Sequence, residues 1–314
     1  MFYNRTYFIL AVIKIFFGGN MHFTGTIWRP PYEASSSLLQ VTAGCTHHKC
    51  KFCSLYADLP FKFRLSPDDE IESDLKELSI FYPQGKRMFL TGANPFALST
   101  EKLAKLAENI HRYLPQIKTI GCFSRVTDIT PKSVRELKEL CLLGYDGIII
   151  GTETGDDEAL AFMRKGYKAA DIVRELHKLQ EAGIGYHISY LNGLSGAGNG
   201  EQAARKTAAV YNTLQPLSIS IVALTIFPES DLYEEIKNKT FIETREIEKL
   251  YEQKILIETL SIETMLYANT VSNTAPMSGR LPHDKKRMLT VLQHTIDTLD
   301  EDTLRYYRNG IAHL

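Results

Sequence analysis

The stretch SLLQVTAGCTHHKCKFCSLY (Ser37–Tyr56) joins an apolar run to three cysteines and two histidines. The run Ser37–Gly44 predicts a first buried strand that leads directly into the cysteines. Their spacing is Cys-x4-Cys-x2-Cys, and three thiolates on one tight loop suit a 4Fe–4S cluster. Two other interpretations remain open at this level. Cys45, Cys50 and Cys53 could bind zinc with one of the histidines, or the last two cysteines could form a redox pair.

Composition describes an ordinary globular protein. The 314 residues are 44% hydrophobic and 23% charged, which provides enough apolar material for one large core. The formal net charge of −1 gives no overall basic surface for nucleic acid. Five cysteines, three of them close together, argue against a secreted disulfide framework and predict a cytoplasmic location. The other two, Cys122 and Cys141, lie in apolar patterns and are expected in the core.

After Leu38 the sequence alternates short apolar runs with amphipathic helical patterns. Apolar runs such as Gly147–Ile150 are typical of parallel strands buried on both faces. About six such units are present, fewer than the eight of a closed barrel. We therefore expect an α/β fold, a partial (β/α)6 barrel with a small C-terminal α+β extension. The expected strands span 37–44, 86–92, 117–124, 147–155, 183–193 and 217–227. The expected helices span 68–81, 99–114, 130–144, 156–179 and 201–214, the third with Thr130 as its N-cap.

The chain divides into three expected segments. These are an N-terminal extension (1–20), a core barrel (21–240) and a C-terminal extension that closes the barrel (241–314). The first contains an apolar run that is too short to span a bilayer and lacks a clear cleavage site. A translation start at Met21, a membrane anchor and a core strand all remain open for it. In the last segment, breakers predict a turn-rich loop at Ser272–Pro282, which we interpret as a lid or substrate-contacting segment.

The cysteine triad, GANP (Gly92–Pro95) and GTETG (Gly151–Gly155) follow one another along the chain, and this order resembles that of the radical S-adenosylmethionine (SAM) superfamily. The cysteine triad follows the first strand and has an aromatic residue, Phe52, before its last cysteine. GANP (Gly92–Pro95) ends the second strand, where that superfamily has a Gly-Gly-Glu-Pro motif. GTETGDDEALAFMRKGY (Gly151–Tyr167) and FPESDLYEEI (Phe227–Ile236) look like segments of its MiaB/NifB-type branch. The resemblance covers roughly Leu38 to Glu235.

This resemblance implies two cofactors and a reaction. Cys45, Cys50 and Cys53 would hold one 4Fe–4S cluster, whose open iron binds SAM. Reductive cleavage of SAM would give a 5′-deoxyadenosyl radical that abstracts hydrogen from a small-molecule or unidentified substrate. The implied partner is a one-electron donor such as flavodoxin or ferredoxin. No strong nucleic-acid signal is present, and no membrane association is expected unless residues 1–20 are a real anchor.

The resemblance also implies residues for SAM. Gly92, Ala93, Asn94 and Pro95 would bind the methionine amino group, although Asn94 replaces the motif glutamate and gives a weaker, neutral contact. Glu153 is the candidate for the ribose hydroxyls, Lys165 for the methionine carboxylate, and Asn192 for the turn that approaches adenosine. A solvated charge at a helix end is the alternative for Lys165. The first cysteine gap is one residue longer than the common family spacing.

Other polar residues allow two interpretations. Arg125 could meet a substrate carboxylate or phosphate, or form a surface salt bridge, and Arg280 is equally undecided. Strand alternation sends His187 and Tyr190 to opposite faces, so at most one of them faces the barrel interior. The two histidines between the cysteines are expected to be bystanders.

Three functional hypotheses follow. The first is a radical SAM enzyme of unknown substrate. The second is a non-catalytic iron–sulfur protein that binds and hands on haem, and the third is a zinc-stabilised binding module.

Overall fold

One eight-stranded sheet organises the protein, of which the computed structural model describes residues 21–311. The strand order, β1-β4-β5-β6-β7-β8-β9-β10, follows the chain. Neighbours from β1 to β9 pair in parallel, whereas β10 is antiparallel to β9. Among the described residues β10 does not pair with β1, so the predicted α/β fold is confirmed as an open barrel. The strands are β1 (Ser37–Gln40), β4 (Arg87–Thr91), β5 (Thr119–Ser124), β6 (Ile148–Glu153), β7 (Tyr186–Asn192), β8 (Ser218–Ala223), β9 (Thr264–Ala268) and β10 (Met277–Leu281).

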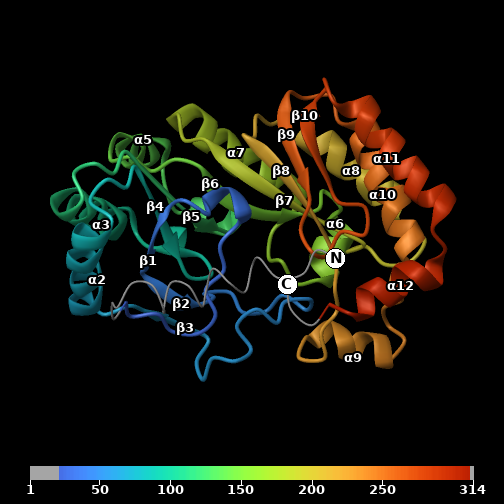
Figure 1. The fold of residues 1–314 in the computed structure, drawn as a ribbon, viewed down its shortest axis with the longest axis horizontal. Helices are drawn as coiled ribbons and strands as arrows, with labels where there is room; N and C mark the ends of the chain where they lie inside the picture. Colours follow the sequence, from blue (N-terminus) through green and yellow to red (C-terminus); the bar gives the residue numbers. More distant parts are fainter. Residues whose placement is uncertain (1–20, 312–314) are drawn as a thin grey trace.

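Helices flank this sheet, with α2, α3 and α5 near its first strands and α8, α10 and α11 near its last (Figure 1). Acids occupy the first turn of α2, where they complement the helix dipole. No described helix is long and apolar enough to cross a membrane, and residues 1–20 lie outside the described residues. The helices are α2 (Asp68–Phe81), α3 (Thr100–Tyr113), α4 (Val126–Ile129), α5 (Val134–Leu142), α6 (Asp157–Phe162), α7 (Ala169–Ala182), α8 (Gly200–Tyr211), α9 (Asp231–Lys237), α10 (Glu246–Thr259), α11 (Lys285–Thr298) and α12 (Glu301–Asn309), with 3-10 turns η1 (Pro31–Glu33) and η2 (Pro95–Ala97).

The two faces of β7, β8 and β9 differ in burial. His187, Ser189 and Tyr267 alternate along their strands and are half-buried on the inner face of the barrel. The intervening residues are buried beneath helices, and the Tyr190 hydroxyl donates to Glu252 of α10 at 2.5 Å. The predicted opposition of His187 and Tyr190 is therefore confirmed, with His187 inside.

A compact group lies at the edge of the barrel where the parallel strands begin. The carboxylate of Glu33 accepts hydrogen bonds from Arg87 Nε at 3.0 Å and Arg87 Nη2 at 2.6 Å, and another from the Ser36 hydroxyl. Tyr32 stacks on His187 with 4.7 Å between ring centroids. We call Tyr32, Glu33, Arg87 and His187 the barrel floor.

The predicted first strand is in fact two. β1 ends at Gln40, and β2 (Thr42–Gly44) leaves the sheet to pair antiparallel with β3 (Phe63–Leu65). Gly44 has φ +73, and a Cβ there would lie 2.2 Å from the Lys62 carbonyl oxygen. Only glycine permits this approach, which closes the cysteine segment into a loop held by a short hairpin.

Two further predictions fail locally. The N-cap of α5 is Ser133 rather than Thr130, because Ser133 and Glu136 form a reciprocal capping box while Thr130 ends the short helix α4. The expected loop Ser272–Pro282 contains β10, which is hydrogen-bonded to β9 and cannot serve as a free lid. Arg280 forms an exposed ion pair with Glu263 at 2.9 Å.

The C-terminal extension continues the barrel sheet, since β9 pairs with β8. It does not close the barrel through β10, which is the outermost strand of the described sheet. The domain boundaries remain predictions.

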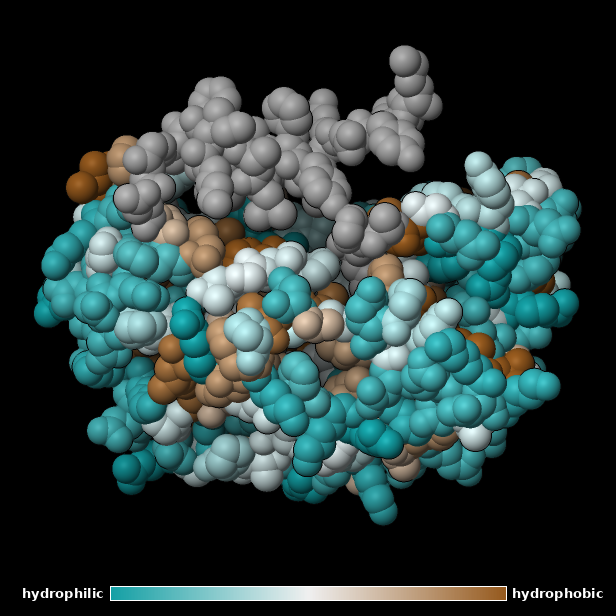
Figure 2. Space-filling model, turned by 90° about the horizontal axis from the view of Figure 1, so that it is seen from below, coloured by the Kyte–Doolittle hydropathy of each residue, from teal (hydrophilic) through white to brown (hydrophobic). Residues whose placement is uncertain are grey.

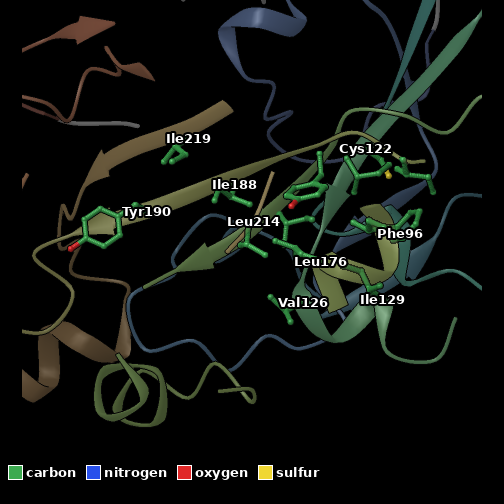
Figure 3. Packing of buried hydrophobic residues seen from close by; sticks show 14 of the residues in the cluster. Phe96, Cys122, Val126, Ile129, Leu176, Ile188, Tyr190, Leu214 and Ile219 are labelled. Atoms are coloured by element: carbon green, nitrogen blue, oxygen red, sulfur yellow. The ribbon is translucent and has the colours of Figure 1, made fainter. Parts of the chain in front are cut away.

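The main core lies between the sheet and its helices. Cys122 is fully buried among Phe96, Ile129 and other apolar side chains (Figure 3), as predicted. Cys141 is half-buried on α5 and packs against the same cluster.

Candidate functional site

The cysteine loop is attached to three separate elements by backbone hydrogen bonds. Cys45 N–H donates to the Lys62 carbonyl beside β3 at 2.8 Å. Lys51 N–H donates to the Met163 carbonyl after α6, and the Lys51 carbonyl accepts from Leu232 N–H of α9 at 2.7 Å. These contacts hold the three cysteines beyond the carboxyl ends of the parallel strands, the usual location of sites in such sheets.

Side chains within the loop add further attachments. The Lys51 ammonium pairs with Glu235 at 2.6 Å and lies 3.9 Å from the Phe162 ring centroid. His47 Nε2 lies 2.6 Å from the Arg164 carbonyl oxygen, so this histidine fastens the loop to the segment after α6. His48 has φ +47, a left-handed turn within the lengthened first gap.

The thiols of the loop lie in a partly desolvated, electropositive setting. Burial raises the pKa of Cys50, while Lys165 and Arg125 act in the opposite direction. Packing around the sulfur raises the pKa of Cys53 to about 11, although part of this residue is exposed. Binding an iron cluster would release the thiol protons, and the two cations would then face thiolates.

Lys165 and Glu153 form a buried ion pair beside these thiols. Lys165 Nζ is 2.9 Å from Glu153 Oε1 and 5.5 Å from the Phe52 ring centroid. Burial lowers the pKa of Lys165, but Glu153, Tyr167 and Cys50 outweigh it and the net shift is upward. The solvated-charge alternative for Lys165 is therefore wrong, and the two predicted SAM residues lie together.

Glu153 is conformationally unusual. Its φ is +60, at the point where the pairing register between β6 and β7 shifts. A residue with a Cβ is strained in this region. Beyond Lys165, the one further hydrogen bond that its carboxylate accepts from the described residues is a long one of 3.3 Å from Ser189.

Arg125, for which the sequence allows two roles, lies beside the Glu153–Lys165 pair. Its Nη2 donates to the Lys165 carbonyl at 2.5 Å, and its Nη1 donates to Thr127 at 2.8 Å. Its Nε is buried and has no hydrogen-bond partner among the described residues. A buried donor without a partner is costly unless a ligand satisfies it.

The GANP segment contacts the cysteine loop directly. Gly92 has φ +124, and a Cβ there would lie 2.1 Å from Thr42 Oγ1, a buried polar atom with no hydrogen-bond partner in the part of the chain that the structure describes. Asn94 is fully buried, with its amide bonded to Thr46 and to Asp128 of α4. Ala93 precedes this asparagine, and Pro95 begins η2.

Asn192 does not join this group. It shares the outer face of β7 with Tyr190, and its Nδ2 donates to the Lys249 carbonyl of α10 at 2.8 Å. Its Oδ1 is buried without a partner in the described structure. Its assignment to adenosine has no support from this placement and remains a prediction.

The donor set fits an iron–sulfur cluster. No three His, Cys, Asp or Glu side chains of the described chain form a group that could hold one metal ion. A 4Fe–4S cluster takes each thiolate on a different iron, so its ligands need not converge on one ion. Figure 2 views the molecule from the side where β2, β3 and α9 lie in Figure 1. On this face, hydrophobic side chains lie in several groups among hydrophilic ones.

Comparison with known proteins decides the family. The model of the family described as "Radical SAM superfamily" matches residues 39–203, more than half of the 314-residue chain. The chain belongs to the radical SAM superfamily. The match includes the cysteine loop, the GANP segment and the Glu153–Lys165 pair. Members of this superfamily are enzymes that use a 4Fe–4S cluster and SAM, the two cofactors that the resemblance implies.

Individual relatives are distant. The haem chaperone HemW of Bacillus subtilis (strain 168) is 24% identical over 196 residues, which are 59% of this chain and 50% of that protein. The chain thus spans about half the length of this curated relative.

Solved structures show the same fold. The radical SAM methyltransferase TsrM of Kitasatospora setae, solved with cobalamin and a [4Fe-4S] cluster, gives a TM-score of 0.55 at 17% identity, over 69% of this chain and 40% of that one. Methylornithine synthase (PylB) gives 0.51 at 12% identity, over 83% and 71%.

Proposed function

We propose that this chain is a radical SAM enzyme whose 4Fe–4S cluster is held by Cys45, Cys50 and Cys53. When bound, the two cofactors supply reductive cleavage of SAM and a 5′-deoxyadenosyl radical for hydrogen abstraction. The observation that carries the proposal is the position of the cysteine loop, which lies beside the Glu153–Lys165 pair and Arg125.

The chain's own residues bind and orient SAM. The Lys165 ammonium and the free Nε of Arg125 are suited to the methionine carboxylate. The Glu153 carboxylate has acceptor capacity left for the ribose hydroxyls. The GANP segment would meet the amino group.

The inner face of the barrel is the proposed location of the substrate. Its half-buried side chains, including Phe123, Ser189, Val222 and Tyr267, offer apolar and hydroxyl groups to a small molecule. Electrons would come from a flavodoxin or ferredoxin. A cytoplasmic location is proposed with them, because the chemistry needs reducing conditions.

The branch within the superfamily is a further part of the proposal. GTETG and the segment after β8 favour the MiaB/NifB type, whereas the similarity to a haem chaperone favours another branch. That relative's name also supports a second candidate function, haem binding and delivery without radical chemistry.

The test is anaerobic reconstitution of the full chain with iron and sulfide, followed by reduction with dithionite in the presence of SAM. We expect about four irons per chain and formation of 5′-deoxyadenosine. Tight haem binding with no SAM cleavage would favour the second candidate. One zinc per chain with neither activity would overturn both.

A further inference from the structure

We propose that Asp128 is a positioning residue for SAM. It fixes the Asn94 amide so that Oδ1 faces the start of the cysteine loop, and it supplies the negative charge that Asn94 lacks. This inference rests on the proposed function. The group recognised is an ammonium, that of the methionine part of SAM.

The hydrogen bonds of Asn94 determine which way its amide points. The Thr46 backbone N–H, at 3.2 Å, can only donate, so the atom facing it is Oδ1. The Asp128 carboxylate oxygen, at 3.0 Å, accepts, so the atom facing it is Nδ2. The opposite orientation would set donor against donor and acceptor against acceptor.

One acceptor position remains on Asn94. Nδ2 uses both of its hydrogens, on Asp128 and on the Thr46 hydroxyl at 2.6 Å. From the described residues, Oδ1 accepts one hydrogen bond, from Thr46 N–H, and so keeps its second lone pair. Because Thr46 directly follows Cys45, this lone pair lies at the start of the loop that would hold the cluster.

Asp128 is built into the structure as a buried acceptor. It is 6% exposed, and Oδ2 also accepts from Arg125 N–H at 2.7 Å. Lys132, buried nearby, donates to the Phe96 and Asp128 carbonyl oxygens. The carboxylate therefore connects α4, the GANP segment and, through Asn94, the cysteine loop.

This arrangement relates two departures from the family pattern, namely Asn94 in place of the motif glutamate and the longer gap between the first two cysteines. With a carboxylate at position 94, two acids would lie against each other, and both could not ionise easily. With an amide at position 94, the negative charge lies on Asp128, on the far side of the amide from the cysteine loop. Thr46, in the lengthened gap, is hydrogen-bonded to both Oδ1 and Nδ2 of that amide. The charge still favours an ammonium near Oδ1, through polarisation of the amide.

The test is a charge exchange between the two positions. We measure the SAM dissociation constant by equilibrium dialysis on the reconstituted full chain, and the melting temperature of the cluster-free chain. Asp128→Asn should weaken SAM binding about tenfold, the effect of losing a hydrogen bond to a charged group. Its iron content should not change. Asn94→Asp should lower both SAM affinity and melting temperature, because two carboxylates then meet.

The double variant N94D/D128N should return SAM affinity to within about threefold of wild type. Asp74→Asn is the matched control. Asp74 is also buried and accepts a backbone N–H and a side-chain donor from His22, away from the loop. It should leave SAM affinity unchanged.

Three outcomes separate the possibilities. A wild-type chain that binds iron but not SAM would overturn the proposed function, and this inference with it. Wild-type binding with an unchanged D128N would overturn the inference alone. If D128N does not fold, N94D and the double variant decide the matter, and a double variant that binds SAM no better than N94D would overturn the inference.

Discussion

Two buried ion pairs lie at opposite edges of the barrel, and they differ in how many of their polar atoms are hydrogen-bonded. In the barrel floor, Glu33 binds Arg87 through two nitrogens, and Arg87 also donates to the Asp146 carbonyl. Near the cysteine loop, Glu153 binds Lys165 through one contact and keeps acceptor capacity.

The backbone conformations of the two glutamates also differ. Glu33 lies in a regular 3-10 turn, whereas Glu153 is held at φ +60, and Arg125 Nε, near Lys165, has no hydrogen-bond partner among the described residues. Strain and unused hydrogen-bonding groups persist where function requires them. We infer that the floor pair stabilises the fold and that the Glu153 pair belongs to the proposed SAM site.

The largest effect should come from removing a thiol of the loop. Cys50→Ser should abolish 5′-deoxyadenosine formation, because the cluster loses a protein ligand. Cys141→Ser, away from the loop, is the control and should retain activity. Full turnover by C50S would contradict the assignment.

Removing each cation separates the two ion pairs. Lys165→Met should lower SAM cleavage about a hundredfold and Arg87→Met should not, since Lys165 belongs to the proposed SAM site and Arg87 lies in the barrel floor. Arg87→Met should cost about 3 kcal/mol of unfolding free energy, because buried Glu33 loses its partner. Urea unfolding and product assays on both variants check this. Loss of SAM cleavage in Arg87→Met, with normal cleavage in Lys165→Met, would contradict the distinction between the two ion pairs.

The barrel floor should weaken in acid. Burial, with Arg87 nearby, lowers the pKa of His187 to about 4. The unfolded chain then binds a proton between about pH 6.5 and 4 that the folded chain does not, so stability falls as pH drops through this window. Between pH 7 and pH 5, the free energy of unfolding of His187→Gln should fall by about 1–2 kcal/mol less than that of wild type. If urea unfolding shows the same loss of stability in both proteins, His187 is not the cause of the acid sensitivity.

The smallest expected effect is conformational. Glu153→Gly should be more stable than Glu153→Ala by about 1 kcal/mol, because both lose the carboxylate and only alanine keeps a Cβ at positive φ. At Glu33 the order should reverse, since glycine is unfavourable in a regular turn. Melting temperatures of the four variants measure it. The same order at both positions would mean that Glu153 is not strained.

Sequence patterns predicted the parts of the fold that repeat. Long amphipathic helices such as α2 and α3 have a clear period and were found. The strands β2 and β3 have three residues each and no pattern to detect. Alternation in β10 was present but hidden by Pro276, Gly279 and Pro282.

The site was predictable where motifs are local. Glu153 and Lys165 came from one continuous segment. Asp128 was missed because its contact with Asn94 joins residues 34 positions apart through the four-residue helix α4. The shared face of Asn192 and Tyr190 could be read from the sequence, since the two residues are two positions apart on one strand. The capping box of Ser133 and Glu136 was also readable from the sequence.

The most direct measurement is electron paramagnetic resonance of the reduced, reconstituted chain with and without SAM. We expect the signal of a reduced 4Fe–4S cluster that changes when SAM is added, because under the proposed function SAM would bind the cluster beside Lys165. A cluster signal that SAM leaves unchanged, or no such signal in a fully reconstituted chain, would contradict this expectation.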